Sequence, residues 1–253
     1  MEITKNEDLL DQKQIRRLIE HHGKEDWRSK SYDKFQENIL DKSSPFPCYF
    51  AVEAEKKGLA RYIFIDSPYD NHELDRLRNG LYQYIGNYRS IGKRTTLVTF
   101  FKPSNHNLQA EDYKNQFWHV LQYLADHDPV SWPSDIPQNP EDPKWEFCFA
   151  GEPIFVVARA PFYSARKSRY TPYALEITMQ PRGTLDDITG DTKKGQQVRR
   201  VIRERLKQYD LIPPHPDIGD YGTEQTREWM QYVLPDTNEE SVVRCPFTRK
   251  KGD

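Results

Sequence analysis

Four stretches of the chain repeat apolar residues at the 3.6-residue spacing of an amphipathic helix. Two of them open the chain, and the others span about residues 70–88 and 112–126. The apolar positions of the two opening stretches are Leu9, Leu10, Ile15, Leu18, Ile19, Tyr32, Phe35, Ile39 and Leu40. We therefore predict four helices in the first half of the chain.

Runs of aromatic and β-branched residues predict the strands. Residues 48–52 and 59–66 flank a charged turn that ends in Gly58, as expected of a β-hairpin. Further strands are predicted at 95–101, within the run Trp145–Val157, and at 173–180. Since strands and helices come in clumps and do not alternate strictly, the fold class expected is α+β, a single domain with a largely antiparallel sheet flanked by helices.

The second half of the chain contains fewer helices and more loops. A basic helix is predicted over 196–209, in which arginines 199, 200, 203 and 205 are interpreted as a solvated face, and a last helix near 223–232. Five prolines between residues 128 and 143 exclude regular structure there, and Trp132 and Ile136 indicate a loop packed on the surface. The expected organisation is a helical segment, residues 1–44, packed on a main domain, residues 45–253.

Composition excludes several classes of function. The chain has 253 residues, with 37 Lys and Arg against 39 Asp and Glu, so no overall field attracts nucleic acid or an anionic membrane. No apolar run reaches the ~20 residues that a membrane span needs, and the N-terminus lacks a signal-peptide core. We expect a cytoplasmic protein without nucleic-acid or membrane partners.

Motifs of several common enzyme classes are missing from the sequence. It contains no phosphate-binding loop, dinucleotide fingerprint, zinc-protease helix or serine-hydrolase elbow. The three cysteines, Cys48, Cys148 and Cys245, are far apart and odd in number, which argues against a disulfide framework or a structural zinc site. His215 lies in a rigid loop, Pro213–Asp217, that would hold an imidazole in place for a ligand.

The most informative stretch begins at Trp145 and continues to Arg169. An apolar strand that includes Phe155 is followed closely by two aromatic side chains and three cations, at 162–169. Aromatic walls beside cations suit a flat, apolar, anionic ligand. We therefore expect the ligand site here.

Six short segments, in this order, resemble the YqcI/YcgG family. The resemblance covers most of the chain from about residue 45 to residue 247. The segments are Pro45–Ala51, Phe147–Pro153, Arg166–Arg169, Gln180–Arg182, Pro214–Asp217 and Cys245–Phe247.

The resemblance implies a cofactor and a reaction, because members of this family include heme-dependent enzymes that hydroxylate a guanidine nitrogen. It thus implies heme b and a guanidine-bearing small molecule, arginine or an arginine-derived compound, as substrate. Dioxygen would be the oxidant, with electrons from an external reductase or ferredoxin, or peroxide would replace both. The alternatives are a non-catalytic heme carrier or sensor, and a heme-free small-molecule-binding protein or hydrolase.

The iron ligand is open at this point. Where related sequences often have a histidine before the Arg-Lys-Ser-Arg segment, this chain has Tyr163. Tyrosinate is a known heme ligand and nearby cations would lower the pKa of a phenol, which makes Tyr163 the first axial candidate. Cys48 and Cys245 are the alternatives, since thiolate ligation supports oxygen activation.

Charged residues complete the expected site. Arg166, Arg169 and Arg182 are candidate anchors for the heme propionates, and Phe155 a candidate wall. A guanidinium substrate needs a carboxylate, for which Glu152 is the most conspicuous acid, although it could instead pair with a nearby arginine. Glu152 and His215 are the expected catalytic residues, and the oligomeric state stays open, a homodimer included.

Overall fold

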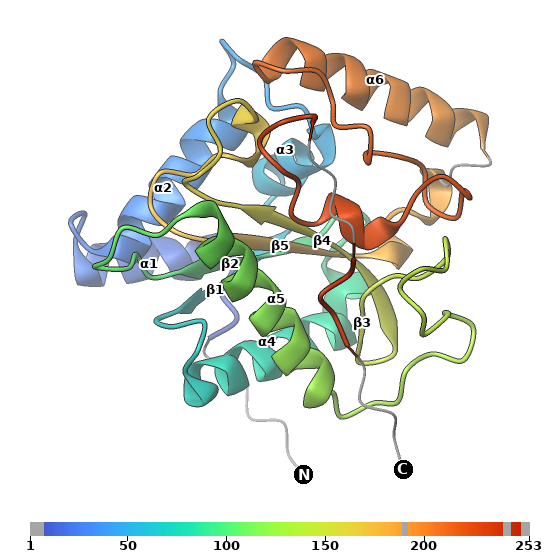
Figure 1. Ribbon diagram of the computed structural model, residues 1–253. Helices are drawn as coiled ribbons and strands as arrows, with labels where there is room; N and C mark the ends of the chain where they lie inside the picture. The colour runs from blue at the N-terminus through green and yellow to red at the C-terminus, as the bar shows by residue number, and fades with distance from the viewer. Residues whose placement is uncertain (1–7, 189–191, 240–243, 249–253) are drawn as a thin grey trace.

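A five-stranded mixed sheet forms the centre of the protein (Figure 1). The computed structural model describes residues 8–188, 192–239 and 244–248. The strand order is β1-β2-β5-β4-β3, with β1 and β2 parallel and the other neighbouring pairs antiparallel. The α+β class with a largely antiparallel sheet is therefore confirmed. The strands are β1 (Ala60–Ile65), β2 (Thr96–Phe101), β3 (Cys148–Phe149), β4 (Glu152–Arg159) and β5 (Glu176–Pro181).

Helices cover both faces of the sheet (Figure 1). Helices α4 (Asn71–Ile91) and α5 (Ala110–Asp126) pack on one face and share its apolar core. Helices α1 (Gln12–His22) and α2 (Trp27–Leu40) pack on the other face, over β1 and β2. The four helices predicted from periodicity are thus confirmed.

The strands divide their side chains between these two cores with a period of two. In β1, Ile63 and Ile65 face the core under α4 and α5, whereas Tyr62 and Phe64 face the core under α1 and α2. Because both faces are buried, the strand is almost continuously apolar.

The hairpin predicted over residues 48–66 is wrong. Residues Tyr49–Lys56 form helix α3. Strand β1 pairs in parallel with β2, and helix α4 connects the two strands. Phe50 and Ala54 are both buried at helical spacing, and good helix formers follow them, so packing at i and i+4 overrides the local strand propensity.

A tight hairpin lies at the stretch that the sequence singled out. Ala150 and Gly151 form the two-residue turn that joins β3 to β4, and both have positive φ, 53° and 74°. Two-residue turns with positive φ are common in hairpins because their twist matches that of the strands.

The last predicted helix, near 223–232, is only a single 3₁₀ turn, Glu228–Gln231. Tertiary bonds such as Trp229 Nε1 to the Pro140 carbonyl oxygen (3.0 Å) hold this segment.

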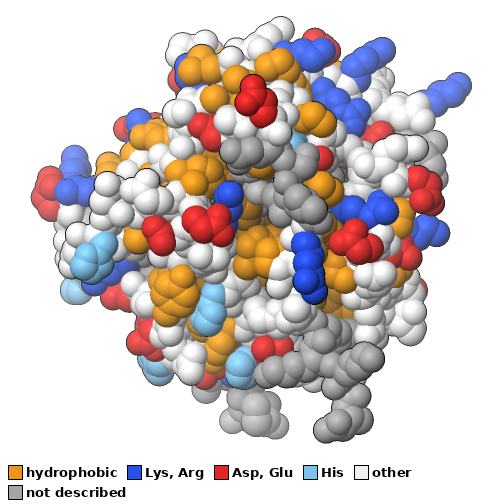
Figure 2. Space-filling model, in the orientation of Figure 1, with side chains coloured by type: hydrophobic (Ala, Val, Ile, Leu, Met, Phe, Trp, Pro, Cys, Tyr) orange, Lys and Arg blue, Asp and Glu red, His pale blue; other side chains and the backbone are white. Residues whose placement is uncertain are grey.

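The proline-rich segment is the surface-packed loop that was predicted. Trp132 donates its indole N–H to the Ile136 carbonyl oxygen (2.8 Å) and stacks near Trp145, with ring centroids 6.3 Å apart. Figure 2 shows cationic and anionic side chains interspersed over one face of the molecule, as the near balance of charge implies. None of the helices within the described ranges is long and apolar enough to cross a bilayer.

Candidate functional site

A cavity of about 300 Å³ opens between the β4–β5 half of the sheet and helix α6 (Lys193–Tyr209). Its floor is formed by side chains of β4 and β5, which alternate as strand geometry requires. Phe155 and Val157 point into the cavity, whereas Ile154, Val156 and Ala158 enter the core beneath. The volume is at the lower end of the range typical of small-molecule sites.

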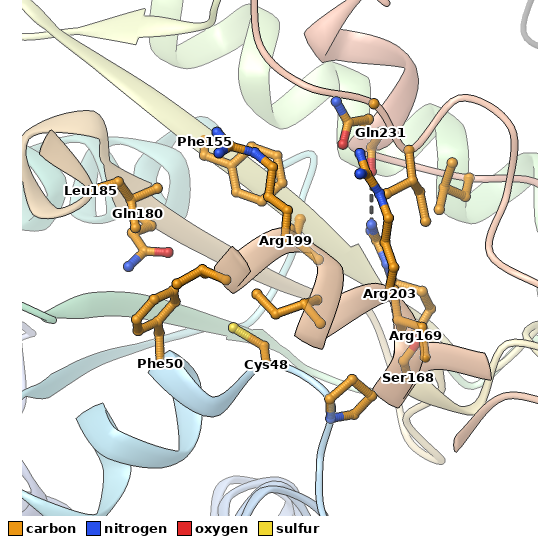
Figure 3. Close-up of a pocket in the computed structure, with 18 of the residues that line it drawn as sticks. Cys48, Phe50, Phe155, Ser168, Arg169, Gln180, Leu185, Arg199, Arg203 and Gln231 are labelled. Atoms are coloured by element: carbon orange, nitrogen blue, oxygen red, sulfur yellow. Dashed lines mark hydrogen bonds between the residues drawn. The ribbon is translucent and has the colours of Figure 1, made fainter. Parts of the chain in front are cut away.

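Helix α6 forms the roof. Val198, Ile202 and Leu206 recur every four residues and line the cavity as a half-buried apolar stripe. Arg199 and Arg203 lie beside that stripe and line the cavity as well (Figure 3). The basic face was predicted to be solvated and paired with Glu204 and its neighbours. These two arginines instead line the cavity, and both pair at 3.0 Å with one oxygen of Asp220.

Cys48 is the thiol of this cavity. It stands at the N-terminus of α3, and Figure 3 shows its sulfur between the side chain of Phe50 and the α6 roof. Burial raises the pKa of Cys48, although the Ala51 and Phe50 amides and the Arg205 charge favour the thiolate. Burial outweighs these amides and this cation, so the free side chain is a neutral thiol that would lose its proton on binding a metal ion.

The three predicted anchors, Arg166, Arg169 and Arg182, all line the cavity, but protein oxygens engage their guanidinium groups. Arg169 donates to the carbonyl oxygens of Gln231 (2.9 Å) and Tyr232 (3.1 Å). Arg166 donates to those of Pro235 (2.6 Å) and Thr237 (3.1 Å). These two arginines therefore fasten the C-terminal segment to the sheet.

Arg182 connects two buried acids. It forms a two-bond fork with Glu146, which is fully buried, with Nη2 2.5 Å from Oε1 and Nε on the other oxygen. Glu228 receives one longer bond from Nη2, at 3.2 Å. The guanidinium carbon also lies 3.6 Å from the centroid of the Tyr221 ring. We call Glu146, Arg182 and Glu228 the acid pair cluster.

The acid pair cluster has two carboxyl groups for one guanidinium. Burial, followed by the neighbouring Glu146 charge, raises the pKa of Glu228 from its usual value near 4.5 to about 8. Burial likewise raises the pKa of Glu146, against the Arg182 charge that lowers it. Glu228 lines the cavity, so a carboxyl that a nearby cation would ionise faces the site where a ligand would lie.

Tyr163 lies outside the cavity lining. It is 1% exposed, and its hydroxyl donates to the Leu234 carbonyl oxygen at 2.7 Å. Burial raises the pKa of Tyr163 and outweighs the charges of Arg169 and Arg166. The structure thus holds a neutral phenol at this position.

Glu152, His215 and Cys245 also lie away from the cavity lining. Glu152 begins β4 and accepts a 2.6 Å bond from the Tyr88 hydroxyl, with Arg89 3.4 Å away. His215 is buried, and its Nδ1 accepts from the Asp217 amide at 3.1 Å. Cys245 packs in the core under α4 and α5, where burial raises its pKa to about 12.

Among the predicted site residues, the structure therefore brings together Cys48, Phe155, Arg166, Arg169 and Arg182. Sequence reasoning missed Glu146, Glu228, Asp220 and Tyr221. The sequence did contain a signal for the cavity roof. Arg199 and Arg203 are four residues apart, and each follows or precedes an apolar residue of a stripe with the same spacing. In the part of the chain that the structure describes, no group of three His, Cys, Asp or Glu side chains could hold a metal ion.

Comparison with known proteins finds relatives that match most of this chain. Two uncharacterized proteins of Bacillus subtilis (strain 168), YqcI and YcgG, are 38% and 37% identical to the chain over 229 and 230 residues. These alignments cover 89% and 90% of each of the chains compared.

A third relative has a functional name. The protein provisionally named N(omega)-hydroxy-L-arginine synthase DcsA, from Streptomyces lavendulae, is 31% identical over 252 residues, 98% of this chain and 92% of its own. No solved structure matches the chain. The YqcI/YcgG family itself matches residues 35–248, and the chain belongs to this family.

Proposed function

We propose that the protein is a heme-dependent monooxygenase that hydroxylates a nitrogen of a guanidine-bearing small molecule. The observation that carries the proposal is a thiol, Cys48, at a helix N-terminus in the wall of an apolar cavity. The resemblance of the whole chain to a relative named for the synthesis of N-hydroxy-arginine supports the reaction class.

The cavity residues suit a porphyrin. Phe50 and Phe155 offer aromatic faces, and the α6 stripe adds aliphatic cover that excludes water. Arg199 and Arg203 share Asp220 as an ion-pair partner, and these two cations could receive anionic propionates. Cys48 would hold the iron through its sulfur, in place of the first candidate of the sequence, Tyr163.

The reaction needs heme, dioxygen and two electrons besides the substrate. Heme held by Cys48 would supply the activation of dioxygen. One oxygen atom enters the N–H bond of the substrate, and the other leaves as water with two protons. The two electrons come from an external reductase or ferredoxin. The chain's own residues orient the guanidine and keep bulk water out.

Optical spectra test the proposal. Protein produced with a heme precursor is expected to show a Soret band, to bind CO when reduced, and to convert L-arginine to its N-hydroxy derivative. Cys48→Ala is expected to lose or shift the Soret band and to lower turnover by at least about a hundredfold, since iron ligation is lost.

Cys245→Ala is the matched control, because that thiol lies in the core and outside the cavity. It is expected to keep the spectrum. A wild-type protein that takes up no heme would contradict the proposal, and one that binds heme but refuses CO would be a carrier or sensor.

A further inference from the structure

Two carboxylates compete for one guanidinium beside the cavity. Glu146 takes the two short bonds that Arg182 makes, in the forked geometry that is strongest for this pair. Glu228 retains a 3.2 Å bond to Arg182 and a 3.4 Å contact from the Gln231 amide. Its carboxylate is therefore only weakly compensated, although it is 5% exposed.

A weakly compensated buried carboxylate is costly, and a second cation would remove that cost. Glu228 lines the cavity, whereas Glu146 does not, so a cation could reach Glu228 from the cavity alone. The Tyr221 ring, stacked on Arg182 at 3.6 Å, lines the same cavity and favours planar cations. The other carboxylate of the wall that the structure describes, Asp210, already accepts hydrogen bonds from the Ser168 amide (2.7 Å) and hydroxyl (2.9 Å).

We propose that Glu228 binds the guanidinium group of the substrate and is the residue that selects a cationic substrate over a neutral one. This inference rests on the proposed function for the identity of the cation, and it moves the substrate-binding acid from Glu152 to Glu228. Glu146 acts as a positioning residue, because its fork holds Arg182 and leaves Glu228 available.

The raised pKa of Glu228 adds a distinctive signature. Near pH 7 the carboxyl is largely protonated, and an incoming guanidinium favours its ionised form. Binding should therefore release up to about one proton per substrate. The other groups that face Glu228 are Arg182, Glu146, Arg199, Tyr221 and Tyr232.

Calorimetric titration with L-arginine and L-citrulline tests the proposal, since citrulline is a neutral isostere of arginine. The full-length protein is titrated as purified, and its heme content is read separately from the Soret band. We expect wild type to prefer arginine, and Glu228→Gln to weaken arginine binding by roughly ten- to a hundredfold while leaving citrulline binding nearly unchanged.

Glu152→Gln is the comparison variant, and its arginine affinity should stay within about twofold of wild type, because its carboxylate is tied to Tyr88 outside the cavity. Unchanged arginine affinity in Glu228→Gln, or equal binding of arginine and citrulline by wild type, would overturn the proposal. Absence of the Soret band alone would count against the heme and not against Glu228.

If Glu228→Gln does not fold, two measurements remain. Glu228→Asp keeps the charge and should retain part of the preference for arginine. Titration of wild type in buffers of different ionisation enthalpy should show proton release on arginine binding at pH 7, and release of no proton would overturn the inference.

Discussion

Two buried acid clusters on the same side of the sheet differ in how their charge is compensated. Glu55, on α3, is 2% exposed and accepts hydrogen bonds from four neutral side chains. Its donors come from α1, α2 and β1: Gln12 at 2.7 Å, Gln36 at 2.6 Å, Tyr32 at 3.2 Å, and Tyr62. The acid pair cluster instead sets two carboxylates against one guanidinium.

The two clusters also differ in what lies beside them. The donors of Glu55 belong to packed helices and a strand, so their bonds join α1 and α2 to the sheet. Glu228, in contrast, lines the cavity. A buried carboxylate that accepts hydrogen bonds from several packed elements holds those elements together. A buried carboxylate with few donors beside a cavity is a candidate to bind a ligand.

The largest effect on stability is expected from Glu55→Gln. The glutamine side chain has one acceptor oxygen and an NH₂ group that donates. Some of the four side chains that now donate to Glu55 would therefore face another donor in a buried site. We expect the free energy of unfolding to fall by about 2–3 kcal/mol in urea denaturation, with arginine affinity unchanged.

Glu53→Gln is its control on the same helix, since Glu53 makes only an exposed i, i+4 pair with Lys57. This control should lose at most ~0.5 kcal/mol. Equal losses in the two variants would show that the enclosed carboxylate has no special structural role.

The acid pair cluster should make stability depend on pH. The pKa of Glu228 is raised on folding, so the folded state binds more protons than the unfolded state between about pH 4.5 and pH 8. The free energy of unfolding therefore falls as pH rises through this window. We expect the Tm of wild type to drop by several degrees, on the order of 5 °C, from pH 5.5 to pH 8.5.

Glu228→Gln should flatten this pH dependence, because it removes the group that loses a proton. Thermal unfolding followed by circular dichroism at the two pH values measures the difference. A slope as steep as that of wild type would mean that the excess proton resides elsewhere.

The smallest effect is expected from Tyr163→Phe. It removes one hydrogen bond to the Leu234 carbonyl oxygen in a site that lies apart from both clusters. The expected cost is about 1 kcal/mol of unfolding free energy, with the Soret band unchanged. A lost or shifted Soret band would restore Tyr163 as the iron ligand.

Local periodicity was sufficient for α1, α2, α4 and α5, since each helix buries one apolar stripe that is visible in the sequence. The same local signals predicted β2, the β4 run and the class of the fold. They failed at α3, because a run of aromatic and β-branched residues there packs Phe50 and Ala54 on one helical face.

The cavity depends on contacts between residues far apart in the chain. Phe155, Arg166, Arg169 and Arg182, which the sequence suggested as cofactor-binding residues, all line the cavity, and their role there stays a prediction. Local context favoured Glu152, which stands in an apolar stretch, over Glu228, which follows Thr226 and Arg227. Tertiary packing places Glu228 at the cavity beside Arg182 and ties Glu152 to Tyr88. These contacts join segments whose separation in space the order of residues does not specify.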